Sequence, residues 1–428
     1  MFNLTGPIRS SIANLKTERR LQKIFVSAIP PVVIFPVSHA VGLSVIRTLE
    51  NEDIPILALD FKEESAGHYS RHVTPLLLPE LGRDPESFAQ GMLELGACFE
   101  QKPVLFLVDD EELFLSLKQG SLFDQYYQLP LSPWHIVEPI VDKGQMYRNL
   151  QKKNYPIPSS WFPASMEELE HIKNELPYPC IVKPTYSTTF RQIFGVKAKR
   201  FDDYAPLKAF VAKLLTTPLD FVIQAFIPGG AESLYTYAAY SNDEGEPIAS
   251  FTGRKIHQFP PDFGTCRLGE SVKNPELEKL GAELLRILHY RGISLTEFKR
   301  DANGDFRLIE LNPRPGDWPE RLAQICGANL VLTAYKESLG QKVSPHQITR
   351  FGVKWANLAE DLYYCVRGYK QLGYPKAHRG WAGWFKDIKG LAGCAFFSWR
   401  DPLPALIRFK GMARDFYQRE KSHKAADQ

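Results

Sequence analysis

An Asn-Gly pair at positions 303 and 304 separates two segments that are rich in strand-forming residues. Both central residues of a type I′ hairpin turn need a positive φ, and Asn-Gly supplies it more readily than other pairs. We therefore predict that Ser294–Asp301 and Asp305–Pro313 form an antiparallel hairpin with a two-residue turn. Glu297 and Glu310 lie equally far from this turn, so they are expected to face each other.

Two opposed carboxylates on one face of a sheet repel each other, and a bound cation would reverse that penalty. Strand alternation puts Asn312 and Arg314 on the face of Glu310, and Ile309 and Leu311 on the core face. Carboxylate and amide oxygens suit Mg²⁺, which usually binds one or two carboxylates together with substrate phosphates. The hairpin therefore predicts a magnesium site. The alternative is a solvated hairpin with a chance charge clash.

The composition is that of an ordinary globular protein, with 44% apolar and 24% charged residues. A net charge of +3 does not by itself indicate nucleic acid. No stretch reaches the 18 or more apolar residues of a membrane-spanning helix. The six cysteines form no CxxC pair and have no nearby His at ligand spacing, so neither a zinc site nor a disulfide framework is suggested. A cytoplasmic, reducing environment is expected.

Three blocks follow one another along the chain. Residues 1–141 predict a Rossmann-like parallel sheet, because two apolar strand patterns flank an amphipathic helix. Residues 142–340 contain the hairpin and two further apolar strand patterns, one at 180–184, which contains Lys183, and one at 221–227, which runs into Pro228-Gly229-Gly230. Residues 341–428 are rich in aromatic and basic residues and carry no motif that indicates a role. The strand, helix and strand expected in the first block are residues 32–36, 41–50 and 54–60.

Five short motifs occur in a fixed order: Asp142-Lys143, Cys180–Pro184, Val222–Gly229, Glu297–Lys299 and Ile309–Arg314. The series resembles the ATP-grasp superfamily, and within it the predicted carboxylate–amine ligases. The resemblance covers roughly residues 30–340. It implies an α/β fold with a Rossmann-like pre-ATP-grasp domain (1–141), an ATP-grasp domain of two α+β subdomains that enclose ATP (142–340), and a C-terminal extension (341–428).

The resemblance implies roles for particular residues of the middle block. Two lysines contact the ATP phosphates, three residues line the adenine site and one carboxylate binds ribose: Lys143 and Lys183, then Gln224, Ala225 and Ile227, then Glu232. The implied ligands of Mg²⁺, or of Mn²⁺, are Glu297, Glu310 and Asn312. The implied catalytic cations, which face the γ-phosphate and an acyl phosphate, are Arg314, Arg254 and Lys255. The sequence departs from the family at Ala225, usually charged in relatives, and in the Gly-poor lid loop 185–195.

The function implied is an ATP-dependent ligase that joins a small carboxylic acid to an amine through an acyl phosphate and releases ADP and phosphate. Two alternatives stay open. One is other ATP-grasp chemistry, either carboxylating or kinase-like. The other is a nucleotide-binding scaffold that uses the basic ends of the chain at a membrane surface. A carboxylate pair argues for catalysis, because a scaffold does not need two opposed charges.

Overall fold

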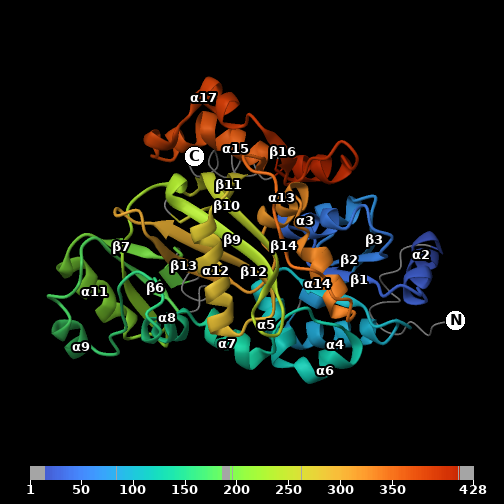
Figure 1. The fold of residues 1–428 in the computed structure, drawn as a ribbon, viewed down its shortest axis with the longest axis horizontal. Coiled ribbons are helices and arrows are strands. Elements are labelled where there is room, and N and C mark those ends of the chain that lie inside the picture. Colours follow the sequence, from blue (N-terminus) through green and yellow to red (C-terminus); the bar gives the residue numbers. More distant parts are fainter. Residues whose placement is uncertain are drawn as a thin grey trace, which may run out of the picture.

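The computed structural model describes residues 15–412, except 83, 186–192, 195 and 262, together with residue 414. Within these residues the strands form three sheets, flanked by helices (Figure 1). The large sheet lies between the N-terminal domain and a smaller sheet that carries α9 and α11. No helix in the described residues is long and apolar enough to cross a membrane. Most of the predicted lid loop 185–195 and the basic end beyond 414 lie outside the described residues.

The N-terminal sheet is parallel, with strand order β3-β2-β1-β4. Strands β1, β2 and β4 are buried along their whole length, as expected for a parallel sheet covered on both faces. The predicted βαβ unit is confirmed. The elements are α2 (Leu15–Phe25), β1 (Val32–Phe35), α3 (Ala40–Thr48), β2 (Ile56–Asp60), η1 (Ala66–Tyr69), β3 (Thr74–Leu77), η2 (Pro79–Gly82), α4 (Pro85–Gly96), β4 (Val104–Leu107), α5 (Asp110–Lys118), α6 (Gly120–Tyr126) and α7 (Trp134–Val141).

The small sheet is antiparallel, with order β5-β8-β6-β7. Apolar residues of β6 and β8 pack against α9 and α11 and form a separate core. The predicted strand at 180–184 is confirmed, whereas the strand predicted at 221–227 ends at Ala225. The elements are α8 (Lys143–Lys152), β5 (Ser160–Trp161), α9 (Met166–His171), β6 (Cys180–Pro184), β7 (Lys199–Phe201), α11 (Tyr204–Leu214) and β8 (Phe221–Ala225).

The large sheet has the order β13-β12-β9-β10-β11-β15-β16, and β14 pairs with β10 off this path. The adjacent pairs from β13 to β15 are antiparallel. Its first elements are η3 (Ala231–Ser233), β9 (Leu234–Ser241), β10 (Pro247–Phe259), β11 (Thr265–Ser271), α12 (Pro275–Leu288), β12 (Gly292–Arg300), β13 (Phe306–Asn312), α13 (Pro319–Cys326) and α14 (Leu330–Ser338).

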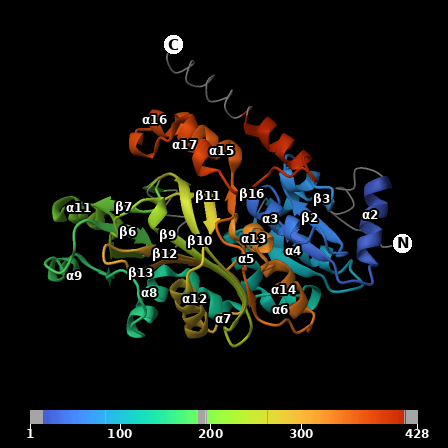
Figure 2. The same ribbon diagram turned by 45° about the horizontal axis from the view of Figure 1, so that its top comes forward.

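Residues after 340 complete the large sheet and cover one of its ends (Figure 2). Three short strands join the sheet, and helical segments pack together around Cys365, Tyr369 and Trp384. We refer to residues 358–388 as the helical cap. The elements are β14 (His346–Gln347), β15 (Lys354–Ala356), α15 (Leu358–Tyr363), η4 (Tyr364–Gly368, a π-helical segment), α16 (Tyr369–Gln371), η5 (Pro375–Ala377), α17 (Gly380–Asp387) and β16 (Leu391–Cys394).

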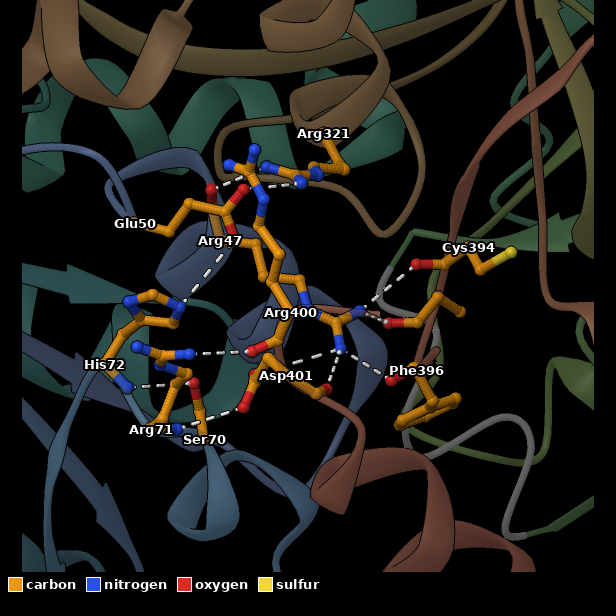
Figure 3. A network of polar contacts seen from close by, with 11 residues as sticks. Arg47, Glu50, Ser70, Arg71, His72, Arg321, Cys394, Phe396, Arg400 and Asp401 are labelled. Atoms are coloured by element: carbon orange, nitrogen blue, oxygen red, sulfur yellow. Dashed lines mark hydrogen bonds and ion pairs between the residues drawn. The ribbon is translucent and has the colours of Figure 1, made fainter. Parts of the chain in front are cut away.

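Arg47 of α3 ties the segment after β16 to the N-terminal domain (Figure 3). Only 1% of this residue is exposed, and its guanidinium donates to the backbone carbonyls of Cys394, Ala395, Phe396 and Asp401 at 2.6–3.3 Å. An irregular segment leaves carbonyls without sheet partners, and a guanidinium carries enough donors to bind several of them. We call this group the Arg47 network.

Candidate active site

The predicted hairpin is present, and β12 and β13 pair Glu297 directly with Glu310. The prediction of a two-residue turn is wrong. Asn303 is not among the positive-φ residues, whereas Gly304 has a φ of +91°. The backbone N–H of Asp301 donates to the carbonyl of Asp305 at 2.8 Å, which closes a three-residue loop. One extra loop residue shifts the register of the two strands by one residue. Glu297 would then no longer face Glu310 unless a second irregularity offset the shift.

A β-bulge in β13 restores this pairing. Glu297 pairs with Glu310, but the next pair is Phe298 with Leu308, so Ile309 is the extra residue of the bulged strand. The bulge also re-aims Ile309, which was predicted to face the core and instead lines a cavity. Bulges recur next to active sites, where they redirect side chains.

The cavity has a volume of about 720 Å³ and is bounded by the small sheet, the large sheet and residues of α3 and the start of α5. Its size is in the range of ligand-binding pockets, roughly 300–1,000 Å³. Most of the residues singled out from the sequence line it. These are Lys143, Lys183, Gln224, Ala225, Ile227, Glu297, Glu310, Asn312 and Arg314.

Each of the two opposed carboxylates is paired with a lysine. Lys143 Nζ lies 2.9 Å from Glu310 Oε1, and Lys255 Nζ lies 2.6 Å from Glu297 Oε1. The charge of Lys143 lowers the pKa of Glu310 to about 2, so this carboxylate is ionised at neutral pH. Burial would lower the pKa of Lys255, but Glu297 outweighs it and the pKa is raised. The expected repulsion between the two carboxylates is therefore relieved by cations of the chain itself.

Lys183 is buried rather than solvated, although it lies near the end of its strand, β6. Its ammonium donates to Gln224 Oε1 at 2.9 Å, and the Gln224 amide donates to the Ser160 hydroxyl at 2.9 Å. Burial, followed by the charge of Lys143, lowers the pKa of Lys183 to about 8. A buried ammonium that borders a cavity is well suited to bind an anionic ligand. Burial removes the water that would solvate the positive charge, and a bound anion would stabilise that charge instead.

Arg314 lies beyond β13 and reaches the N-terminal domain. Its Nε and Nη2 donate to the two carboxylate oxygens of Asp110, the latter at 3.2 Å, and Nη1 donates to the Pro315 carbonyl at 3.2 Å. Burial would lower the pKa of Arg314, but Asp110 outweighs this effect and raises it. Asp110 follows β4, and the carboxyl ends of parallel strands are where ligands bind in open α/β sheets. Asp110 was not among the site residues predicted from the sequence, and its pairing with Arg314 was missed.

Three predicted site residues are not among those that line the cavity in the described part of the chain. Arg254 Nε donates to Glu270 at 3.1 Å, and alternation along β10 places Arg254 on the opposite face from Lys255. Lys255 contacts the site through its ion pair with Glu297, which does line the cavity. Glu232 is exposed and accepts the Gly230 N–H at 3.1 Å.

Other charged residues line the cavity without having been assigned a role from the sequence. Lys299 lies two residues beyond Glu297, so strand alternation would have placed both on one face. Lys197 follows the predicted lid loop, and Asp317 lies in the loop after Arg314. Burial raises the pKa of Asp317. Neither of these loop positions carries a periodic signal that would have identified it.

No protein-family model matches the sequence. A curated relative, the arginine-specific large chain of mitochondrial carbamoyl phosphate synthase from Neurospora crassa, is 22% identical over 270 residues, which are 59% of this chain and 22% of that protein. This chain thus spans about a fifth of that relative's length.

Solved structures resemble the chain over most of its length. The ADP complex of an N5-carboxyaminoimidazole ribonucleotide synthetase has a TM-score of 0.59 at 15% identity and covers 81% of this chain and 86% of its own. The L-amino acid ligase from Bacillus licheniformis has a TM-score of 0.56 at 18% identity, with 73% and 75% covered.

The biotin carboxylase domain of the Hydrogenobacter thermophilus 2-oxoglutarate carboxylase, solved with MgADP, ADP and bicarbonate, has a TM-score of 0.58 at 14% identity, with 76% and 73% covered. Each of these neighbours shares the overall fold at low sequence identity. The chain therefore has the ATP-grasp fold that its motif series predicted.

Proposed function

We propose that the chain is an ATP-dependent carboxylate–amine ligase. The observation that carries the proposal is the pairing of Glu297 with Glu310 at a cavity that Lys143 and Lys183 also line. A protein that binds a metal–nucleotide complex uses carboxylates to bind the metal ion and ammonium groups to bind the phosphates. The ATP-grasp fold and the neighbours solved with ADP support this assignment.

The residues divide between the nucleotide and the metal. Lys143 and Lys183 contact the phosphates, while Gln224, Ala225 and Ile227 line the adenine site at the end of β8. Glu297, Glu310 and Asn312 are the hard oxygen donors that fit Mg²⁺, or Mn²⁺, and this ion would neutralise developing charge on the phosphates. Glu232 stays a prediction for ribose, and we leave Arg254 out of the catalytic group because Glu270 already binds it.

The reaction follows from the cations around the cavity. The carboxylate of the acid attacks the γ-phosphorus of ATP, the bond to the β-phosphate oxygen breaks, and an acyl phosphate and ADP form. The amine then attacks the acyl carbon, phosphate leaves and the amine proton is lost. Arg314 stabilises the anionic groups of both steps. Its bonds to described residues use three of the five guanidinium donors, so two remain for a ligand.

A carboxylating reaction is the second candidate, because one neighbour was solved with bicarbonate and another is named for a carboxyamino compound. Bicarbonate would then take the place of the organic acid. The test incubates the protein with ATP, Mg²⁺ and an amine pool, in one arm with a pool of organic acids and in the other with bicarbonate. ADP, phosphate and a new amide mass in the first arm support the ligase. Turnover in the bicarbonate arm alone supports carboxylation, and no turnover in either arm contradicts both.

A further inference from the structure

A second polar cluster lies where β10 meets the helical cap. It contains His257 of β10, Asp361 of α15 and Cys365 of η4, all three buried, with one ligand atom each within 4.8 Å of the others. His257 Nδ1 lies 2.9 Å from Asp361 Oδ1 and 3.5 Å from Cys365 Sγ, and this sulfur lies 3.7 Å from Asp361 Oδ1. We call these residues the cap cluster.

We propose that the cap cluster binds a Zn²⁺ ion. Tetrahedral zinc with bonds of about 2.0–2.3 Å holds neighbouring ligand atoms roughly 3.3–3.6 Å apart. Both distances to the Cys365 sulfur agree with that spacing to within about 0.2 Å. The Nδ1–Oδ1 distance of 2.9 Å is shorter, so zinc binding would require these two atoms to separate by about 0.4 Å. Three protein ligands leave a fourth position on the ion, which a water molecule would occupy.

The surroundings of the cap cluster resemble the outer shell of a metal site. The other ring nitrogen of His257 lies 3.1 Å from Asp387 Oδ2, and Arg379 holds this carboxylate through bonds of 2.7 and 3.1 Å. Trp384 Nε1 donates to the second oxygen of Asp361 at 2.8 Å. A carboxylate behind a histidine ligand fixes the ring, and a donor behind a carboxylate ligand fixes its free oxygen. Asp387 has the first role for His257, and Trp384 has the second role for Asp361.

Both ring nitrogens of His257 face carboxylate oxygens, Nδ1 that of Asp361 and Nε2 that of Asp387. Zn²⁺ takes the place of the Nδ1 proton and of the Cys365 thiol proton, and both protons leave to solvent. The site then holds one dication against one thiolate and the Asp361 carboxylate.

The ion would fasten the helical cap to a wall of the cavity. His257 precedes Gln258, which lines the cavity, and the Tyr369 hydroxyl of the cap donates to the Gln258 carbonyl at 2.7 Å. Residue spacing could not indicate this cluster, because His257 is 104 residues from Asp361 and 108 residues from Cys365. The fold brings these distant positions together.

The test measures metal in the full-length protein. Protein made with zinc in the medium and desalted should carry about one zinc ion per chain by elemental mass spectrometry. His257→Gln and Cys365→Ser should each lower the zinc content about fivefold or more. Protein reconstituted with Co²⁺ should show a thiolate-to-cobalt charge-transfer band in the near ultraviolet, which Cys365→Ser removes. Circular dichroism monitors the fold of each variant.

Cys326→Ser is the matched control, because Cys326 is as fully buried as Cys365 and belongs to a different core cluster. It should keep both the zinc and the cobalt band. A folded wild-type protein without zinc and without the cobalt–thiolate band would overturn the proposal and leave the cap cluster as a hydrogen-bonded group without a metal. Zinc retained in both ligand variants would also overturn it, since the ion would then lie elsewhere. The wild-type measurements need no variant to fold.

Discussion

The cavity and the Arg47 network both bury cations, but their surroundings differ. Around Arg47, backbone carbonyls surround the guanidinium, and Arg321 donates to the Arg47 carbonyl at 2.7 Å and to Glu50 at 2.8 Å (Figure 3). Around Lys183, one side is a 720 Å³ cavity. The first group joins two parts of the chain, whereas the second faces space that a ligand can fill.

A lowered pKa of a buried cation does not distinguish the cavity from the Arg47 network. Burial lowers the pKa of Arg47 to about 10 and that of Lys183 to about 8. Structural ion-pair networks perturb pKa values as active sites do, so the shift alone cannot identify a site. What distinguishes Lys183 is the combination of burial, an adjacent cavity and a neighbouring carboxylate pair.

Glu310→Gln should have the largest effect. The carboxamide keeps the shape but removes the charge that pairs with Lys143 and that the metal requires, so turnover should fall by about a thousandfold or more. Steady-state ADP release measures the loss, with circular dichroism as the check of the fold. A variant within tenfold of wild type would mean that the cavity carboxylates are structural, like those around Arg47.

Arg314→Lys should lower turnover by about one to three orders of magnitude with little change in ATP affinity. Lysine retains one charge but loses the planar fork that Asp110 orients. Asp110→Asn, which keeps Arg314 itself, should give a smaller loss. Equal turnover in wild type and Arg314→Lys would remove Arg314 from the proposed chemistry.

Lys183→Ala should weaken ATP binding by about ten- to a hundredfold, since it removes a charge beside the phosphates. The pKa of about 8 also predicts a pH dependence, because the ammonium loses its proton as the pH rises through that value. Wild-type affinity should fall above pH 8, by up to about tenfold per pH unit. Lys183→Arg, which stays charged, should flatten the profile. Calorimetry from pH 6.5 to 9.5 makes the comparison, and identical profiles would contradict it.

Arg47→Met should act on stability and leave the reaction nearly unchanged. It leaves several buried carbonyls without donors, so the free energy of unfolding should fall by about 3–5 kcal/mol. Turnover per folded molecule should stay within about twofold of wild type. Denaturant unfolding and ADP release measure the two quantities. A large loss of turnover in stably folded protein would break the contrast between the two regions.

Arg254→Ala should have a similarly small effect, within about twofold of wild-type turnover, because Arg254 pairs with Glu270 outside the cavity lining. The sequence resemblance assigned this arginine a catalytic role. A loss above a hundredfold, at unchanged ATP affinity, would restore that role and contradict the placement seen here.

The sequence was informative where the pattern is local. The βαβ unit and the strand at 180–184 follow from short-range periodicity, and the pairing of Glu297 with Glu310 follows from a turn signal. The turn type was wrong, and the pairing survived because the bulge at Ile309 offsets one extra loop residue. Loop length and bulge have opposite effects on register, so the symmetry of the two glutamates alone could not distinguish the two hairpins.

What the sequence missed depends on long-range contacts. Asp110 meets Arg314 across 204 residues, and Arg47 meets Ala395 across 348. Neither of these pairs is marked by a sequence motif, because each pair forms only when distant parts of the chain pack against one another. The lysine partners of the two glutamates were noted from the sequence, but as ligands of phosphate rather than as ion pairs.

The transfer of oxygen from the acid to phosphate tests the central claim most directly. The protein is incubated with ATP, Mg²⁺, an amine pool and a pool of organic acids whose carboxyl oxygens carry ¹⁸O, and the released phosphate is analysed by mass spectrometry. An acyl phosphate requires that each phosphate released in coupled turnover contain one ¹⁸O atom, and that Glu310→Gln release almost none. Phosphate free of ¹⁸O, or AMP and pyrophosphate in place of ADP and phosphate, would contradict the ligase mechanism.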